Sequence, residues 1–147
     1  MKSVRNALNR RAKGEKGFTL VELLVVVIII GILAAVAVPI YLNQRKAAWN
    51  STIQSDVKNA SLVVETAMTA NNGKFDTSWA DTYGPGPAKK NLGSSDQEVT
   101  VSKDVTITIA AGEDTNNYTI TGSDTNGGTK QYTYDSSTGE ISESAKQ

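Results

Sequence analysis

The 147-residue chain contains no cysteine and no histidine. Without cysteine it has no disulfide framework, no thiolate nucleophile and no cysteine metal site. Without histidine it lacks the commonest general base, the commonest transition-metal ligand and the side chain that titrates near neutral pH. These absences argue against an enzyme, and no motif in the chain indicates a catalytic residue, a cofactor or a metal ion.

The formal net charge of the chain is zero, but acidic side chains are scarce near its N-terminus and exceed the basic ones in the rest. Residues 1–17 carry six basic side chains against one acidic side chain, which gives +5. Residues 18–147 carry nine basic against fourteen acidic side chains, which gives −5. An acidic domain is a poor match for a phosphate backbone. We therefore expect a basic leader and an acidic domain that does not bind nucleic acid.

A long apolar run follows the basic leader. Together with Phe18 to Glu22, the unbroken stretch from Leu23 to Val38 measures about 31 Å as a helix, which is long enough to span a bilayer. It is longer and richer in β-branched residues than the core of a secretory signal, which argues against cleavage near Ala37. Because the positive charges precede the run, the N-terminus should stay in the cytoplasm while the acidic domain is exported.

Three residues in or beside this run are not typical of a simple membrane anchor. Glu22 brings a carboxylate into it, and an ionised acid inside hydrocarbon costs about 2.5–3.5 kcal/mol. Glu22 is therefore either a functional acid that needs a cationic partner or an interfacial residue among headgroups, and its position leaves both open. Pro39 removes a backbone donor and should kink or loosen the helix. Gly31 and Pro39 fit a functional helix break and the ordinary tolerance of membrane helices equally well.

The stretch Gly17-Phe18-Thr19-Leu20-Val21-Glu22-Leu23-Leu24, between a basic leader and an apolar helix that contains Pro39, resembles the class III signal of type IV prepilins and pseudopilins. In that family a membrane aspartyl protease, the prepilin peptidase, cuts after the glycine and methylates the new N-terminus. The resemblance implies that residues 1–17 are a cleaved leader that ends at Gly17. Phe18 would then be the N-methylated first residue.

The resemblance also implies a role for the acid. Cutting after Gly17 creates a cationic amine at Phe18, and in a filament built around these helices Glu22 would pair with the amine of a neighbouring subunit. An out-of-register subunit would leave a buried charge unpaired, at a cost of roughly 3–5 kcal/mol. Thr19, on the same helical face as Glu22, either assists by hydrogen bonding or simply starts the helix.

After the apolar run the pattern becomes periodic and predicts that the helix continues through residues 43–72. Asn71-Asn72-Gly73 predicts its end, because asparagine and glycine accept the left-handed conformation. Trp49 is predicted to be a core or membrane-edge anchor. Spacings of three and four place one set of residues on the buried face, with Ser61 elsewhere: Trp49, Ile53, Val57, Ala60, Val64 and Ala67.

Residues 73–97 are predicted to be a connecting loop. Gly84-Pro85-Gly86-Pro87 opposes regular structure, and Lys89-Lys90 indicates a solvated turn. Phe75, Trp79 and Tyr83 recur every four residues. This spacing favours a short helix that caps the core over an exposed stack that binds carbohydrate.

Residues 98–147 are predicted to form an antiparallel sheet of about four strands, with Glu140 to Ser142 as a candidate last strand. Asp124-Thr125-Asn126-Gly127 lacks most features of a calcium loop and is predicted to be a turn. The positions that alternate with polar residues are Val99, Val101, Val105, Ile107, Ile109, Tyr118, Ile120, Tyr132 and Tyr134.

The predicted fold is α+β, with a long N-terminal helix whose second half packs on a small antiparallel sheet. Residues 18–42 would form the transmembrane and polymerisation helix, and residues 43–147 the globular domain. The resemblance favours a major type IV pilin, a single-pass membrane precursor that an inner-membrane platform and its ATPase polymerise with copies of itself into a surface pilus. The disulfide common in the family is excluded by composition.

Other functions remain open at this point. A pseudopilin of a type II secretion or DNA-uptake system is the nearest alternative, since it would carry the same signal. An uncleaved single-pass membrane protein that displays a small binding domain would explain the helix and the charge asymmetry, but not the coincidence of Gly17, Phe18 and Glu22. A secreted enzyme comes last, because no motif indicates its chemistry.

Overall fold

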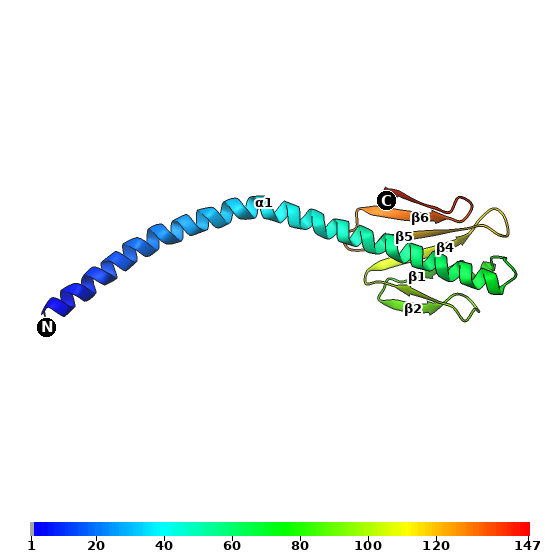
Figure 1. The fold of residues 1–147 in the computed structure, drawn as a ribbon, viewed down its shortest axis with the longest axis horizontal. Coiled ribbons are helices and arrows are strands. Elements are labelled where there is room, and N and C mark those ends of the chain that lie inside the picture. Colours follow the sequence, from blue (N-terminus) through cyan, green and yellow to red (C-terminus); the bar gives the residue numbers. More distant parts are fainter. Residues whose placement is uncertain (1) are drawn as a thin grey trace. The chain divides into compact units, whose positions relative to one another are not determined.

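The computed structural model describes the backbone of residues 2–147 and the side chains of residues 19–147. Gly17 and Phe18, the predicted cleavage site, lie outside the residues whose side chains are described. One helix, α1 (Lys2–Ala70), is followed by a turn of 3₁₀ helix, η1 (Thr77–Trp79), and by short strands (Figure 1). The chain divides into two compact units, Met1–Asn43 and Gln44–Gln147. We call residues 44–147 the head.

Pro39 lies inside α1, and the helix does not end there or at Gly31. The helix therefore continues through both residues, and the kink or loosening expected at Pro39 stays a prediction. Pro39 has no N–H to donate to the carbonyl four residues earlier, and a helix can continue past the loss of that one hydrogen bond. A change of the helix at these residues on assembly stays a prediction.

The end of α1 follows the predicted signal. Asn72 and Gly73 both have positive φ, 57° and 76°. The N–H of Gly73 donates to the carbonyl of Met68 at 2.8 Å, which satisfies a carbonyl that the last turn leaves without a helical partner.

The main sheet of the head has five antiparallel strands in the order β1-β4-β5-β6-β7. Antiparallel pairing places Ile109 opposite Ile120 and Tyr134 opposite Ile141. The alternation of buried and exposed residues along β4 and β5 confirms the period of two in the sequence. The strands are β1 (Thr82–Tyr83), β4 (Val105–Ala111), β5 (Tyr118–Asp124), β6 (Lys130–Asp135) and β7 (Glu140–Ala145).

A second sheet lies where the sequence indicated mainly a loop. β2 (Ala88–Asn91) pairs antiparallel with β3 (Glu98–Val101) and not with the main sheet. The interpretation of residues 73–97 as loop alone was therefore wrong, and Lys89-Lys90 belongs to a strand instead of a solvated turn. β2 has one half-buried residue and three exposed ones, so its sequence carries no apolar alternation that could reveal a strand.

Gly86 lets the chain pass close to the turn between β3 and β4. A Cβ at Gly86 would lie 2.1 Å from the carbonyl oxygen of Ser102. The N–H of Gly86 donates to the carbonyl of Val105 at 3.0 Å, and its own carbonyl accepts from Asp104 at 2.9 Å. The stretch Gly84–Pro87 therefore packs closely against the turn between β3 and β4, and a side chain at residue 86 would force the backbone to shift.

The core of the head is the interface between residues 50–70 of α1 and the main sheet (Figure 1). Ile53, Val57 and Val64 are fully buried there, as their spacing predicts. Ala60 and Ala67, from the same predicted face, are also buried. Two residues of the helix differ from expectation. Trp49 is only half-buried, and Ser61 is buried at 7% exposure, with its hydroxyl donating to the carbonyl of Lys58 at 2.6 Å.

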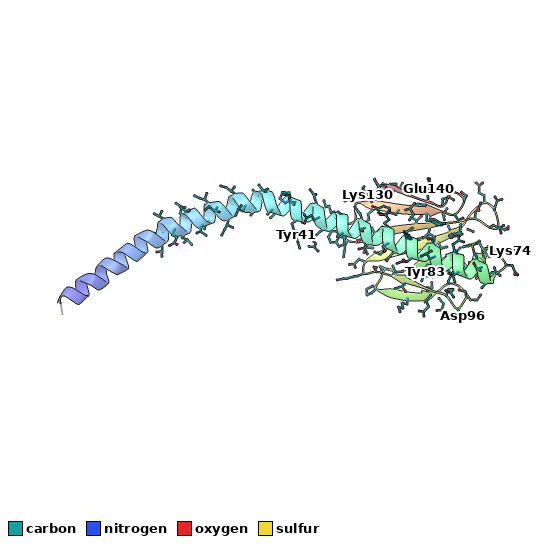
Figure 2. The ribbon with its side chains drawn as sticks, in the orientation of Figure 1. Tyr41, Lys74, Tyr83, Asp96, Lys130 and Glu140 are labelled. Carbon is teal, nitrogen blue, oxygen red and sulfur yellow. The ribbon has the colours of Figure 1, made fainter. Side chains whose placement is uncertain are left out.

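Three aromatic side chains from residues 73–97 belong to the core. Phe75, Trp79 and Tyr83 are 8%, 3% and 1% exposed, which contradicts an exposed carbohydrate-binding stack. Phe75 packs edge-on against Trp79 and stacks on Tyr118, with ring centroids 5.5 and 5.4 Å apart. The helix predicted from their spacing is shorter than expected. Of the three residues only Trp79 lies in the helical turn Thr77–Trp79, and Tyr83 lies in β1. Figure 2 shows the side chains of the head, with Tyr83 labelled.

Candidate assembly site

The first unit exposes its apolar side chains. Leu20, Leu23 and Ile32 are exposed over 70%, 63% and 63% of their surfaces, and the other large apolar residues from 20 to 42 are exposed as well. Monomeric soluble proteins rarely expose a contiguous apolar patch of more than a few hundred Å². The helix is also long and apolar enough to cross a membrane. This segment therefore requires either lipid or other protein chains around it.

Glu22 lies in this exposed apolar segment. Its side chain is exposed on the helix, and Leu20, Val21, Leu23 and Leu24 surround it in sequence. Among the residues with described side chains, the two ion pairs are Lys90–Asp81 and Lys130–Glu143, so Glu22 has no ionic partner there. If lipid or protein covered the segment, the carboxylate would need a cation from outside the described residues.

Thr19 and Gly31 lie on the same segment. Thr19 is exposed, three residues before Glu22 on the helix. A Cβ at Gly31 would meet no atom within 4 Å, so nothing in this chain requires a glycine there. The arrangement leaves Gly31 as a point where another helix can approach the backbone closely.

Three polar residues of α1, Asn50, Asp56 and Glu65, form hydrogen bonds with the strands and loops of the head. The sequence did not indicate these contacts. Asp56, 6% exposed, accepts hydrogen bonds from the backbone N–H and the hydroxyl of Ser102 at 2.7 and 2.8 Å. Asn50 accepts from the N–H groups of Thr129 and Lys130 at 3.1 and 3.3 Å. The hydroxyl of Tyr118 donates to Glu65 at 2.6 Å.

The contact of Glu65 with Tyr118 changes the chemistry of the phenol. Burial, together with the hydrogen bond to Glu65 and its negative charge, raises the pKa of Tyr118 well above its usual value. The neutral phenol donates to the carboxylate, whereas a phenolate would be repelled by it. Tyr118 therefore ties the helix to β5 in its protonated form.

The segment Asp124–Gly127 forms a turn, as predicted. The carboxylate of Asp124, 2% exposed, accepts from the backbone N–H groups of Asn126 and Gly127. A carboxylate oxygen used in this way closes the loop on itself. Among the described residues, no group of three or more acidic, histidine or cysteine side chains could hold a metal ion.

Comparisons with known proteins decide what the exposed segment and the head are together. Residues 12–38 match the family model described as the prokaryotic N-terminal methylation motif. A fimbrial protein of Pseudomonas aeruginosa is 38% identical over 107 residues, 67% of this chain and 68% of that protein. The type IV narrow pilus major component PilA5 of Thermus thermophilus is 31% identical over 111 residues, 72% of this chain and 96% of that protein. The chain belongs to the type IV pilin family.

Other pilin relatives are matched over smaller shares. The type IV major fimbrial protein FimA of Dichelobacter nodosus is 40% identical over 78 residues, 53% of this pilin but 45% of FimA. This pilin therefore spans less than half the length of that relative, and the partners and activity of whole pili are proposals for it. No solved structure matched the chain.

The buried polar residues of this pilin escape a sequence pattern for a physical reason. Asn50 and Asp56 lie beside the apolar stripe of α1, where a polar residue ordinarily faces solvent. Their partners are 79 and 46 residues away in the chain. The one available signal is that Asn50 precedes Ile53, and Asp56 follows it, by the three-residue spacing that keeps all of them near one helical face.

Proposed function

We propose that this pilin is made as a prepilin and assembled into a surface filament as its structural subunit. The observation that carries the proposal is an exposed apolar helix with one acid, Glu22, joined to a head whose core is complete. The prepilin peptidase would cut after Gly17, and Phe18 would become the N-methylated first residue. The matched methylation motif, residues 12–38, covers both positions.

Glu22 is proposed to set the register of the filament. The cut produces a cationic amine at Phe18, and a neighbouring subunit would present that amine to the carboxylate. Ion pairs that lie away from water are stable only when both partners are in place. A subunit in the wrong register would leave both charges unpaired, so pairing selects the correct position. Thr19 is proposed to support Glu22 by hydrogen bonding.

The precursor is proposed to reside in the cytoplasmic membrane. The basic leader, residues 1–17, would remain in the cytoplasm, residues 18–42 would span the bilayer, and residues 43–147 would form the exported globular domain. An inner-membrane assembly platform and its ATPase would then move the helix from lipid into a bundle of identical helices. This transfer exchanges lipid contacts for protein contacts, so the apolar side chains of residues 20–42 would not face water at either stage.

The test is the mass of the intact chain and of its N-terminal peptide in two cell fractions, filaments sheared from the surface and washed membranes. We expect methylated Phe18 as the first residue of an abundant sheared species. The same processed end confined to membranes would indicate a pseudopilin or a minor subunit instead. An intact Met1 leader in both fractions would refute the prepilin and leave an uncleaved membrane protein with a binding domain.

A further inference from the structure

The end of the head at which α1 enters is held together by one loop. The loop between β5 and β6, residues 125–129, contacts Trp49, since a Cβ at Gly127 would lie 2.2 Å from the Trp49 ring. Asn50 accepts hydrogen bonds from Thr129 and Lys130, and the N–H of Lys146 donates to the carbonyl of Thr129 at 3.1 Å. These contacts bring parts of the chain that are distant in sequence to one surface.

The turn between β3 and β4 joins the same surface. The N–H of Thr125 donates to the carbonyl of Asp104 at 3.0 Å, and the amide of Asn126 donates to its carboxylate at 2.7 Å. Lys103 is the residue before Asp104 and is exposed. We define the helix-entry end of the head as residues 44–50, 102–104, 125–129 and 146.

The helix-entry end is basic. Its basic residues are Arg45, Lys46, Lys103 and Lys146 and its acid is Asp104, which gives four minus one, or +3. The carboxylates of Asp56 and Asp124 also contact this end, but both are buried. The three lysines are exposed, and neither ion pair found among the described side chains involves them. The guanidinium of Arg45 lies 4.8 Å from the centroid of the Trp49 ring. The half-buried indole of Trp49 therefore lies beside the cation of Arg45.

The opposite end of the head carries the reverse charge. Its segments are residues 71–76, 92–97, 112–117 and 136–139. The N–H of Phe75 donates to the carbonyl of Thr115, and that of Ser136 to the carbonyl of Tyr118, which ties these segments together. Figure 2 shows Lys74 at this end and Lys130 toward the other. Its acids are Asp76, Asp96, Glu113 and Asp114 against Lys74, so one minus four gives −3.

The apolar run ends only a few residues before Arg45, Lys46 and Trp49 in the sequence. Trp49 follows Leu42 by seven residues, which is about 10 Å along a helix. A bilayer of about 40–45 Å has a hydrocarbon core of about 30 Å, so each headgroup layer is about 5–7 Å thick and the backbone of Trp49 lies a few ångströms beyond it. Tryptophan and basic side chains concentrate in that layer.

We propose that the helix-entry end of the head binds the headgroups of anionic phospholipids before assembly, through Lys46, Lys103, Lys146 and the Trp49 ring. The inference rests on the membrane-anchored precursor proposed above. The lysines attract the phosphates, and the indole of Trp49, whose side chain leans toward the N-terminus of its helix, extends back toward the headgroups. The acidic end of a second copy is the competing occupant, but a tryptophan that follows a proposed membrane span by seven residues favours the lipid.

The experiment uses the full chain in phosphatidylcholine vesicles that contain a minor fraction of a phospholipid brominated near its headgroup. Bromine quenches tryptophan fluorescence at short range, and the bromolipid is either phosphatidylglycerol or phosphatidylcholine at one mole fraction. Trp49→Phe isolates the signal of Trp79, which is 3% exposed in the core and should not be quenched. Flotation with the vesicles after an alkaline wash reports insertion separately.

We expect brominated phosphatidylglycerol to quench Trp49 more strongly than brominated phosphatidylcholine. One lysine near an anionic surface favours the anionic lipid by roughly fivefold. The triple variant Lys46→Gln, Lys103→Gln, Lys146→Gln should lose the preference. Lys58→Gln, Lys74→Gln, Lys89→Gln removes the same charge elsewhere from exposed residues and should retain it.

Other results would overturn the inference in distinguishable ways. Equal quenching by both lipids would mean contact without recognition of charge. Flotation without any quenching of Trp49 would refute the inference and leave the membrane precursor standing, whereas failure to float would refute both. Unchanged lipid preference in the first triple variant, together with a low yield of filaments, would assign the lysines to contact with another copy.

Discussion

Residues 20–42 expose every leucine, isoleucine and valine that they contain, whereas in the head the exposed large apolar side chain is Leu62. The head also satisfies its polar groups, since no buried side-chain nitrogen or oxygen among the described residues lacks a hydrogen-bond partner. The apolar side chains of the first unit therefore need lipid or other protein chains to cover them, whereas the head buries its own apolar side chains. A change in the apolar segment should therefore affect processing and assembly, and a change in the core of the head should affect stability.

The largest effect should come from Gly17→Ala, which adds a methyl group where the peptidase of the family accepts glycine. We expect the uncut precursor to accumulate in membranes with its head folded normally. Mass analysis of the N-terminal peptide checks the cut, and Gly14→Ala is the matched control inside the leader. Normal cleavage of the Gly17 variant would contradict the assignment of the site.

Glu22→Ala should be processed and inserted but should enter filaments poorly. In the proposed filament it would leave the amine of a neighbouring Phe18 without its anion, and loss of one partner of a buried pair costs about 3–5 kcal/mol. The measurement is the ratio of sheared to membrane-bound pilin. Val21→Ala shortens the adjacent side chain without removing a charge and should assemble. If Glu22→Ala gave the normal yield, Glu22 would be an interfacial residue instead.

In the head, Asp56→Ala should lower stability without affecting cleavage. It leaves the buried N–H of Ser102 without its acceptor, and the loss of a charged acceptor of two hydrogen bonds costs about 3 kcal/mol. Denaturant unfolding of the full chain in detergent, followed by tryptophan fluorescence, measures the change. Ser55→Ala, on the exposed neighbouring residue, should have little effect. Equal stability of the two variants would show that Asp56 does not fasten the helix.

A smaller effect should appear at high pH. The pKa of Tyr118 is raised in the folded head, so its contribution to stability is fully present below the unfolded pKa of about 10 and is lost as pH rises above that value. The free energy of unfolding should therefore fall above pH ~10. Tyr118→Phe, which has no phenol to titrate, should show a shallower fall. Parallel curves for the two proteins would refute the link between the phenol and stability.

Much of the fold was predictable because its patterns are local. The spacing of Ile53, Val57 and Val64 specifies a helical face, and the alternation in Val105, Ile107 and Ile109 specifies a strand. β2 has no such alternation, and its pairing with β3 depends on Gly86 passing against Ser102, which is a contact between distant segments. For the same reason the sequence did not reveal Asn50 and Asp56 as buried residues.

The candidate site was predictable in a different sense. The motif from Gly17 to Leu24 indicated the family, which the comparisons confirm, whereas the cleavage site and the role of Glu22 stay predictions. The conformation of Gly31 and Pro39 was not predictable in this way. Pro39 specifies a missing hydrogen bond, but whether a helix bends or melts there depends on the chains packed around it.

The polar contacts of α1 with the head occur one after another along the helix, at Asn50, Asp56 and Glu65. A force applied along α1 is therefore shared among these hydrogen bonds, so that they resist it together and do not break one at a time. In a filament of the kind proposed above, tension would reach each head through this helix. The helix would then slide along the rest of the head only if all three contacts broke together.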